Sequence, residues 1–490
     1  MATVKLFNHH IRTPFLFLLI SEYALLFLSV YIGLYLRYDI IIWQPASESL
    51  QNLPIKALVF SSTLIVGMLA MGLYQAPTPQ GRHFFPYTLT RIALSHILGI
   101  LFLFVIYYLF PSVLIGRGIT AYAIVSGIII LSVYRSILFR MLDSRALRKK
   151  VLVLGAGELA FDLIRPDYQL ENGAEDNIKS FKKKRLLSPP YASYLIHGFI
   201  DTGDEEVQIP DEFIVKPGQN LLSYCLEYEI DEIVLAVTDR RKGLPIEDLL
   251  ECKLTNIDVV EYVAFWEKEK GLLRTDMLSP SWLIFCDGCQ QSNFENRVVR
   301  LFDILASIFI IVLMLPFLIL TALLIYVENG FSGPVFYRQE RVGLNGKIFQ
   351  LLKFRSMVVN AESDGEAKWA DKNDSRITFI GQFIRKVRID EIPQVLNILK
   401  GDMSLVGPRP ERPQFVEQLE KKLPFYSTRH RVKPGLAGWA QLKYPYGADE
   451  YDAMRKLQYD LYYVKNHSIF MDMLVLLQTI EVILLGKGAR

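Results

Sequence analysis

The chain has 490 residues, of which 51% are hydrophobic, and its mean hydropathy is +0.24. This length leaves room for several domains, and the apolar content is high for a wholly soluble protein. A formal net charge of +3 is too small to indicate binding to nucleic acid. The four cysteines are too few for a disulfide scaffold, and Cys286 and Cys289 lack the further ligands that a zinc site needs.

Four apolar stretches occupy the N-terminal part of the sequence, and each is close to the roughly 20 residues that cross a bilayer. They lie at residues 14–36, 55–74, 92–115 and 119–138. We therefore predict a four-helix transmembrane domain over residues 1–145. Glu22, inside the first stretch, either has a function there or faces the membrane interface or the interior of the bundle.

Basic residues predict how these spans are oriented. Lysine and arginine are frequent before the first span, between the second and third spans, and after the fourth, whereas the opposite loops hold fewer. By the positive-inside rule, the N-terminus and the body of the protein are expected in the cytoplasm. No small-residue cleavage site follows the first stretch, so we do not expect a removed signal peptide.

A strand-turn-helix pattern follows at residues 150–160. Gly155 and Gly157 in its turn are spaced as in dinucleotide-binding folds, which makes them candidate cofactor-binding residues. Further buried strands are expected at residues 196–200 and 232–237, and a loop at 171–190. The pattern predicts a Rossmann-like domain over residues 146–290. Because such a turn can simply pack a strand on a helix, the domain either binds no relevant ligand or has a regulatory or nucleotide-sugar-binding role.

A second membrane element is expected at about residues 298–327. Pro316 lies in its middle, and a proline there breaks the helix unless the freed backbone groups find other partners. A fifth full span would also place the C-terminal region on the opposite side of the membrane from the middle domain. A re-entrant helix, which enters and leaves on one side, removes this conflict, and an ordinary kinked span is the alternative.

Two adjacent carboxylates, Asp390 and Glu391, follow an arginine-rich segment. Since proline is tolerated only in the first turn of a helix, Pro393 predicts that a helix begins at about Asp390, with Asp390 as its N-cap. The positive end of the helix dipole would favour ionised carboxylates and also attract a phosphate. A purely structural interpretation, in which Asp390 only caps the helix and Arg385 only contacts solvent, is the alternative.

Arginines before and after this pair bring the opposite charge. Arg385 and Arg388 precede it, and Arg409 lies in a loop that prolines restrain. Guanidinium groups can hold a diphosphate through paired hydrogen bonds while a carboxylate attacks phosphorus. Adjacent carboxylates that face a diphosphate also indicate Mg²⁺, which prefers carboxylate and phosphate oxygens. The sequence therefore predicts phosphoryl-transfer chemistry with Asp390 and Glu391 as the catalytic residues.

Three other segments complete the C-terminal region. Residues 337–347 are expected to form a basic turn between strands. Residues 451–463 predict a helix with an aromatic stripe, and this helix carries Asp460. Residues 469–485 combine many apolar side chains with few charges, which is typical of an amphipathic helix at a membrane interface.

Four motifs of this region resemble the catalytic domain of bacterial polyprenyl-phosphate glycosyl-1-phosphate transferases. These are the large monotopic phosphoglycosyl transferases, or undecaprenyl-phosphate sugar phosphotransferases, of exopolysaccharide, capsule and O-antigen synthesis. The motifs are Lys-Phe-Arg-Ser-Met at residues 353–357, Asp-Glu-Ile-Pro-Gln at 390–394, Gly-Asp-Met-Ser-Leu-Val-Gly-Pro-Arg-Pro at 401–410 and Lys-Pro-Gly-Leu-Ala-Gly-Trp-Ala-Gln at 433–441. The N-terminal part resembles the larger members, so the resemblance covers essentially the whole chain.

The resemblance implies a multidomain membrane protein. Its parts would be an N-terminal four-helix transmembrane bundle, a Rossmann-like α/β middle domain, and a C-terminal mixed α/β monotopic catalytic domain at residues 291–490 with the re-entrant helix. The expected location is the bacterial inner (cytoplasmic) membrane, multi-pass, with the catalytic domain on the cytoplasmic face and in contact with membrane lipids. A homodimer formed through the middle domain is possible.

The implied activity is transfer of a sugar 1-phosphate from a UDP-sugar to undecaprenyl phosphate, an early membrane step of polysaccharide synthesis. Asp390 matches the nucleophile that attacks the sugar-bearing phosphorus, expels UMP and forms a covalent phosphosugar intermediate. Glu391 matches the partner carboxylate associated with Mg²⁺. Arg385 matches a phosphate-holding arginine, and Arg355, Arg409 and Asp460 match residues that support the nucleotide or the metal site. Lys353 and Arg388 are further candidate substrate-binding residues, and Glu391 and Asp460 are the candidate metal ligands.

Two other classes of protein also fit parts of the sequence. A membrane-anchored nucleotide-sugar dehydratase or epimerase would combine the spans with the glycine turn, but no tyrosine in the chain has a lysine four residues later, as such sites commonly require. A non-catalytic polysaccharide assembly protein would explain the spans and leave Asp390 and Glu391 without a purpose. The sequence does not indicate which sugar is transferred.

Overall fold

The computed structural model describes most of the chain. The described residues are 3–6, 9–38, 52–74, 84–141, 148–164, 194–203, 205–218, 220–238, 244–275, 277–278, 293–331, 333–358, 376–444 and 450–484. The predicted loop at 171–190 and the pair Cys286 and Cys289 lie outside them. Contacts divide the chain into two compact units, mainly His10–Lys270 and Gly271–Arg490.

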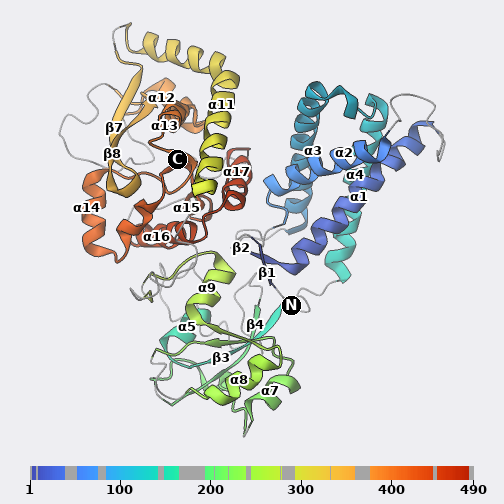
Figure 1. The fold of residues 1–490 in the computed structure, drawn as a ribbon, viewed down its shortest axis with the longest axis vertical. Coiled ribbons are helices and arrows are strands. Elements are labelled where there is room, and N and C mark those ends of the chain that lie inside the picture. The colour runs from blue at the N-terminus through green and yellow to red at the C-terminus, as the bar shows by residue number, and fades with distance from the viewer. Residues whose placement is uncertain are drawn as a thin grey trace. The chain divides into compact units, whose positions relative to one another are not determined.

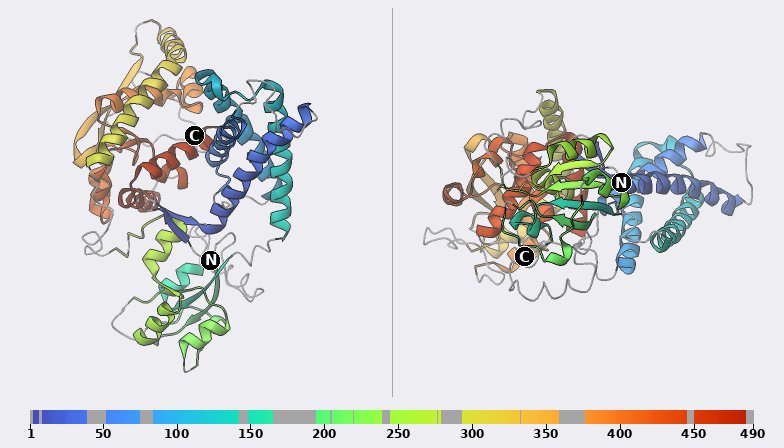
Figure 2. Two further views of the ribbon diagram at one scale, coloured as in Figure 1. Left: turned by 45° about the vertical axis from the view of Figure 1, so that its right-hand side comes forward. Right: turned by 90° about the horizontal axis from the view of Figure 1, so that it is seen from below.

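Apolar helices make up the N-terminal part, as predicted. Two short strands precede them, β1 (Thr3–Leu6) and β2 (His9–Arg12). The helices are α1 (Thr13–Tyr38), α2 (Leu53–Ala70), α3 (Phe84–Leu109) and α4 (Arg117–Met141), with the 3-10 helix η2 (Pro111–Val113) before α4. Each of α1 to α4 contains a stretch long and apolar enough to cross a membrane. Figure 1 and Figure 2 show them side by side from different directions.

An apolar core and close backbone contacts hold these helices together. Leu26, Phe60 and Leu64 are fully buried at the centre of the group. Gly67 lets α2 approach α3, because a Cβ at this position would lie 2.6 Å from the carbonyl oxygen of Ser95. Small residues allow helix backbones to come this close within a membrane.

A buried ion pair joins α1 to α4. Glu22 and Arg135 are 0% and 3% exposed. Arg135 donates from Nε to Glu22 Oε1 at 2.5 Å and from Nη2 to Oε2 at 2.8 Å. Tyr74 donates a further hydrogen bond to Glu22 Oε2 at 2.7 Å. Of the alternatives for Glu22, the structure therefore supports placement in the interior of the helix group.

A parallel β-sheet follows in the same unit. Its strands are β3 (Lys149–Leu154), β4 (Tyr194–Ile200), β5 (Glu232–Leu235) and β6 (Asp258–Glu261), and the helices around it are α5 (Glu158–Ile164), η3 (Asp211–Phe213), α7 (Leu221–Glu227), α8 (Ile246–Leu254) and α9 (Tyr262–Lys270). Within the described residues the strand order is β4-β3-β5-β6. Helices α7 and α8 pack on one face, and Figure 1 shows α5 and α9 on the other. The predicted strands at 196–200 and 232–237 are found as β4 and β5.

The second unit is mixed α/β, as predicted. It contains α11 (Asn293–Glu328), β7 (Phe336–Val342), η4 (Leu344–Gly346), β8 (Ile348–Phe354), α12 (Phe379–Lys386), η5 (Ile389–Gln394), α13 (Val395–Lys400), β9 (Ser404–Val406), α14 (Pro413–Lys422), η6 (Tyr426–Arg431), β10 (Gly435–Ala437), α15 (Trp439–Lys443), α16 (Glu450–Lys465) and α17 (Ile469–Leu484). Strands β7 and β8 form an antiparallel hairpin, whereas β9 and β10 pair in parallel. The prediction of a turn over 337–347 is partly wrong, because Tyr337 to Val342 belong to β7 and only the segment after Val342 turns.

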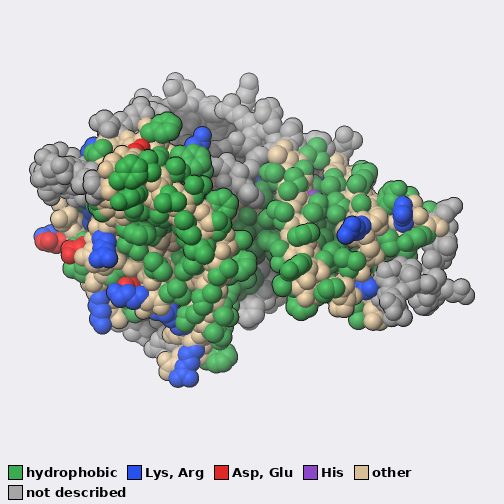
Figure 3. Space-filling view, turned by 90° about the horizontal axis from the view of Figure 1, so that it is seen from above, with side chains coloured by type: hydrophobic (Ala, Val, Ile, Leu, Met, Phe, Trp, Pro, Cys, Tyr) green, Lys and Arg blue, Asp and Glu red, His purple; other side chains and the backbone are tan. Residues whose placement is uncertain are grey.

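Helix α11 is the most apolar of the candidate membrane helices among the described residues, with a hydropathy of 3.1. Pro316 lies inside it, and Figure 1 shows the helix bent. A proline removes one backbone hydrogen bond and crowds the preceding turn, which accounts for a bend. Large apolar side chains such as Phe309, Val312 and Leu313 are exposed along the helix, and Figure 3 shows hydrophobic side chains covering much of the face that it draws.

Replacing Arg135 with methionine is expected to destabilise the protein by about 3–5 kcal/mol, because Glu22 would remain buried and charged without its partner. The double variant Glu22→Gln/Arg135→Met should recover most of this loss, since no unpaired charge is left. Thermal unfolding of the purified variants in detergent micelles measures both effects. A double variant as unstable as Arg135→Met alone would show that the pair does not act through charge compensation.

Candidate active site

The two predicted catalytic carboxylates lie in η5, a 3-10 turn that leads directly into α13. Arg388 occupies the N-cap with a left-handed φ of 58°, and Pro393 lies inside the turn. The prediction that Asp390 is the N-cap is therefore wrong. The left-handed backbone of Arg388 starts the turn earlier, at Ile389, which makes Asp390 its second residue.

Glu391 is surrounded by cations. Its Oε1 lies 3.1 Å from Lys353 Nζ and 2.9 Å from Arg409 Nη2, and its Oε2 lies 3.9 Å from Arg388 Nη1. Burial alone would raise the pKa of Glu391, but Lys353 and Arg409 outweigh this effect and hold the pKa well below its usual range. Lys353 and Arg409 thus favour the ionised form of Glu391 and hold it in place.

Asp390 has the opposite character. It is 9% exposed, and no hydrogen bond or ion pair to its side chain is found among the described residues. Burial, followed by the negative charge of Glu391, raises the pKa of Asp390 from 3.8 to about 6, although Lys353, Arg385 and Arg409 act in the lowering direction. Two adjacent carboxylates with separated pKa values are typical of a catalytic pair in which each group has its own task.

The structure brings together most of the predicted substrate-binding residues. Lys353 on β8 and Arg409 contact Glu391 directly, and Arg385 in the last turn of α12 acts electrostatically on Asp390. Burial lowers the pKa of Lys353 despite the nearby Glu391. Arg355 differs, because its Nε donates to the carbonyl of Pro334 at 3.1 Å and its guanidinium lies over the Tyr337 ring.

Two arginines that the sequence analysis did not single out for the site hold the main chain of the loop that carries Arg409. Arg341 Nη1 donates to the carbonyl of Pro410 at 3.0 Å, and Arg429 Nη2 donates to the carbonyl of Arg409 at 2.9 Å. Gly407 is required at the start of this loop, because a Cβ there would lie 2.2 Å from the carbonyl oxygen of Lys433. In sequence both arginines look like ordinary basic surface residues, so no local pattern distinguishes them.

Asn397 on α13 connects the turn of Asp390 and Glu391 to the hairpin. Its Oδ1 accepts a hydrogen bond from the backbone of Leu352 at 3.0 Å, and its Nδ2 donates to the carbonyl of Gln350 at 2.8 Å. The side chain therefore pairs with β8 as a neighbouring strand would. Because Lys353 follows Leu352 on this strand, the contact fixes the spacing between Lys353 and the turn that carries Glu391.

The carboxylates present fit a magnesium ion only in part. Mg²⁺ is held in proteins by one or two carboxylates together with phosphate oxygens of a substrate, and Asp390 and Glu391 provide that donor set. Among the described residues there is no group of three or more His, Cys, Asp or Glu that could hold a metal ion by itself. Asp460, the other residue predicted at the metal, has its Oδ2 2.8 Å from Arg429 Nη2 instead.

The glycine turn of the parallel sheet is covered by a carboxylate of the protein itself. Gly155 has a φ of 122°, and a Cβ there would lie 2.2 Å from the carbonyl oxygen of Ala236, so glycine is required. A Cβ at Gly157 would lie 2.2 Å from Oε2 of Glu205, whose Oε1 accepts a hydrogen bond from the backbone of Thr238. The structure thus places an acidic side chain where a dinucleotide fold receives a phosphate.

Replacing Asp390 with asparagine is expected to stabilise the protein at pH 8 in EDTA by up to about 3 kcal/mol, because the folded state then contains no ionised carboxylate that burial destabilises. A folded pKa of about 6 lies above the unfolded value of 3.8, so the wild type binds the proton more tightly when folded. The difference in unfolding free energy between the variant and the wild type should therefore shrink as the pH falls from 6 to 4. Thermal unfolding across this range measures it.

The neighbouring variant Glu391→Gln provides the matched control. It should destabilise the protein at pH 8, since Lys353 and Arg409 lose the carboxylate that they share. We therefore expect Asp390→Asn to stabilise the protein and Glu391→Gln to destabilise it. A destabilised Asp390→Asn, or a difference from the wild type that does not change with pH, would contradict the assignment.

Asn397→Ala is expected to lower the free energy of unfolding by about 2–4 kcal/mol, because two backbone groups of β8 lose their partners. Leu396→Ala is the matched control one residue earlier, where the side chain is 48% exposed, and it should change stability by less than about 0.5 kcal/mol. Chemical unfolding in detergent compares the two. Equal effects would show that the Asn397 side chain does not hold the strand.

Comparison with known proteins places the second unit in a described family. Residues 294–486 match the family described as "Bacterial sugar transferase". The chain is 43% identical over 242 residues to the "UDP-N-acetylgalactosamine-undecaprenyl-phosphate N-acetylgalactosaminephosphotransferase" of Aeromonas hydrophila, which covers 49% of this chain and 56% of that protein. It is 41% identical over 204 residues to the "UDP-glucose:undecaprenyl-phosphate glucose-1-phosphate transferase" of Xanthomonas campestris pv. campestris, with 41% and 42% of the two chains covered.

A shorter relative is matched over nearly its full length. The "Uncharacterized sugar transferase EpsL" of Bacillus subtilis (strain 168) is 39% identical over 191 residues, and the match covers 39% of this chain and 89% of that protein. The chain spans only about half or less of the length of the longer relatives that it matches. The chain belongs to the bacterial sugar transferase family, in agreement with its predicted resemblance to polyprenyl-phosphate glycosyl-1-phosphate transferases.

Proposed function

We propose that this protein transfers a sugar 1-phosphate from a UDP-sugar to undecaprenyl phosphate. The observation that carries the proposal is the contrast within one turn between Glu391, which is bound by cations, and Asp390, which is buried with a raised pKa and no bonding partner among the described residues. Several relatives are named as undecaprenyl-phosphate sugar phosphotransferases, which supports the acceptor and the reaction class.

The reaction proceeds in two displacements. A carboxylate oxygen of Asp390 attacks the phosphorus that bears the sugar, and the phosphorus–oxygen bond to UMP breaks with its electron pair leaving on UMP. The sugar phosphate is then attached to Asp390 as an acyl phosphate. A phosphate oxygen of undecaprenyl phosphate attacks the same phosphorus, which forms the lipid diphosphate sugar and returns Asp390 to its carboxylate form.

The charge of the site suits a nucleoside diphosphate sugar. Lys353, Arg385, Arg388 and Arg409 bring four positive charges against the two carboxylates. The site therefore carries an excess of positive charge, which suits an anionic diphosphate. Phosphoryl transfer depends mainly on such positioning and neutralisation.

The raised pKa of Asp390 also suits a nucleophile. With a pKa of about 6, the carboxylate is mostly ionised at neutral pH and is more basic than an ordinary aspartate. Asp390 and Glu391 would hold Mg²⁺ together with phosphate oxygens, and the ion would supply further neutralisation of the diphosphate.

Contacts at both ends of α11 support a re-entrant path through the membrane. Near its start, Arg300 donates to the carbonyl of Leu399 at 2.6 Å, and Asp303 accepts from the backbone of Leu405 at 3.0 Å. Near its end, Ile325 packs with Phe354 and Ile384.

The two ends of α11 therefore rest on one compact unit, whereas a full span would separate them by the roughly 30 Å of the hydrocarbon core. The four-helix transmembrane bundle, the Rossmann-like middle domain and a catalytic domain at the cytoplasmic face of the inner membrane complete the proposed arrangement. This face gives access both to UDP-sugars in solution and to lipid phosphate at the headgroups.

The test measures UMP release by the purified, membrane-reconstituted protein with Mg²⁺, undecaprenyl phosphate and a panel of UDP-sugars. We expect lipid-dependent release with one or a few donors, and a loss of more than about 10³-fold in Asp390→Asn. Glu417→Gln, the same chemical change on the exposed surface of α14, should keep full activity. Release that persists in Asp390→Asn would exclude the covalent route, and no release with any donor would exclude the proposed reaction.

The covalent intermediate can be observed directly. Without acceptor, the wild type incubated with a productive donor should gain the mass of one sugar phosphate, and this gain should be absent in Asp390→Asn. Intact-protein mass spectrometry after rapid acid quenching measures it. A mass gain that remains in the variant would assign the nucleophile to another residue.

A further inference from the structure

A chain of contacts leads from the buried interior of the second unit to the catalytic pair. Arg409 reaches Glu391 through its Nη2 at 2.9 Å, while its main-chain carbonyl accepts a hydrogen bond from Arg429 Nη2 at 2.9 Å. One residue is therefore held at two points, at its backbone by Arg429 and at its side chain by Glu391. Because the contact with Arg429 fixes the backbone of Arg409, it also determines where the guanidinium of Arg409 can reach.

Asp460 is what keeps Arg429 in this position. Its Oδ2 lies 2.8 Å from the same Nη2 of Arg429, and the two side chains are 3% and 7% exposed. A guanidinium nitrogen carries two hydrogens, so Nη2 can donate both to Asp460 and to the carbonyl of Arg409. Arg429 also donates from Nη1 to Tyr426 Oη at 2.7 Å, which fixes the plane of the guanidinium.

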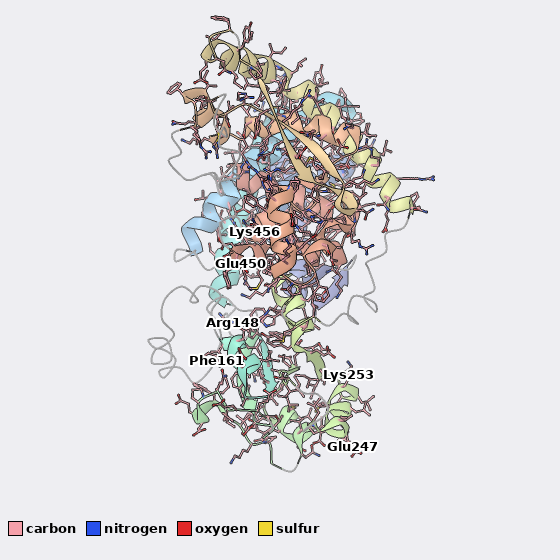
Figure 4. All side chains as sticks on the ribbon, turned by 90° about the vertical axis from the view of Figure 1, so that its left-hand side faces the viewer. Arg148, Phe161, Glu247, Lys253, Glu450 and Lys456 are labelled. Carbon is pink, nitrogen blue, oxygen red and sulfur yellow. The ribbon has the colours of Figure 1, made fainter. Side chains whose placement is uncertain are left out.

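Asp460 comes from α16, a helix remote in sequence from both the acidic pair and the loop. Figure 4 labels Glu450 and Lys456 on this helix. Lys456 is a second positive charge that acts on Asp460, and Glu411 is the nearby negative charge. The contacts lead from Asp460 through Arg429 to Arg409, and from Arg409 to Glu391.

We propose that Asp460 is a positioning residue, which acts through Arg429 and the main chain of Arg409 to hold the Arg409 guanidinium on Glu391. This inference rests on the proposed function of the site. It replaces the expected role of Asp460 at the metal with a role in placing a cation. By fixing Arg409 on Glu391, Asp460 keeps Glu391 neutralised and leaves Asp390 as the carboxylate that faces the substrate.

A role at the metal fits the contacts of Asp460 less well. Mg²⁺ usually keeps several water ligands and binds where substrate phosphates can reach it. Asp460 is 2% exposed, and its carboxylate already compensates a buried arginine. Removing it would take away the carboxylate that compensates the buried guanidinium of Arg429, which is destabilising.

The test is a double-mutant cycle on the rate of UMP release, with Asp460→Asn and Arg409→Met as the single variants. Arg409→Met should lower kcat by about 10²–10³-fold, the usual loss for a preorganised charge in an active site. Asp460→Asn should lower kcat by about 10–100-fold with a smaller change in KM, because the substrate still binds but Arg409 is misplaced. The double variant should fall within about threefold of Arg409→Met alone.

Two outcomes overturn the proposal. If the effects of the two changes multiply in the double variant, Asp460 does not act through Arg409. If Asp460→Asn retains wild-type kcat, it does not position the site at all. If the wild type shows no lipid-dependent UMP release with any donor, the proposed function is rejected. Measuring the wild type first therefore distinguishes a failure of the proposed function from a failure of the positioning role.

A control separates positioning from loss of stability. Glu232→Gln removes another buried carboxylate, which pairs with Lys149 and Lys268 outside the second unit. It should lower the unfolding temperature and leave kcat unchanged. If Asp460→Asn does not fold, Arg429→Lys takes its place in the cycle, because lysine keeps the charge next to Asp460 but lacks the fork that reaches the Arg409 carbonyl. Multiplying effects with Arg409→Met would again overturn the proposal.

Discussion

Two carboxylates on consecutive residues repel each other, and burial makes this repulsion costly unless nearby cations favour one of them. In this protein Lys353 and Arg409 both bind Glu391, and no such bond to Asp390 is found among the described residues. One turn therefore contains two different acids. The pKa of Glu391 is held below its usual range, whereas the pKa of Asp390 is raised to about 6. The rest of the second unit is arranged around this asymmetry, with Asn397 fixing the strand of Lys353 and Arg429 fixing the loop of Arg409.

The long apolar helix is part of the same arrangement. Its start is bound to the end of α13 and to β9 through Arg300 and Asp303, and its end packs on β8 and α12 through Ile325. These elements flank the turn with Asp390, so the depth of α11 in a bilayer would also determine the height of the Asp390 carboxylate. In the proposed reaction this matters, because the lipid phosphate is confined to the headgroup layer while the sugar donor is not.

Local patterns in the sequence predicted the features that depend on local physics. Hydropathy alone located the apolar helices, and short apolar runs that alternate with helical segments located β4 and β5. The N-cap at Asp390 was wrong because a left-handed arginine at position 388 is not indicated by its neighbours. The role of Arg429 could not be predicted, since a buried ion pair between distant residues looks, in sequence, like two surface charges. The position of Glu205 beside Gly157 could not be predicted either, because it depends on a contact between residues 48 positions apart.

The ion pair between Glu22 and Arg135 has a consequence for the way in which this chain is made. The partners are 113 residues apart, so at about 5–20 residues per second the ribosome adds the arginine roughly 6–23 seconds after the glutamate. Tyr74 is only 52 residues behind Glu22 and can donate its hydrogen bond earlier. Until α4 is made, Glu22 lacks the arginine with which it pairs in the folded protein. The contact between α1 and α4 can therefore form only after the fourth helix has been synthesised.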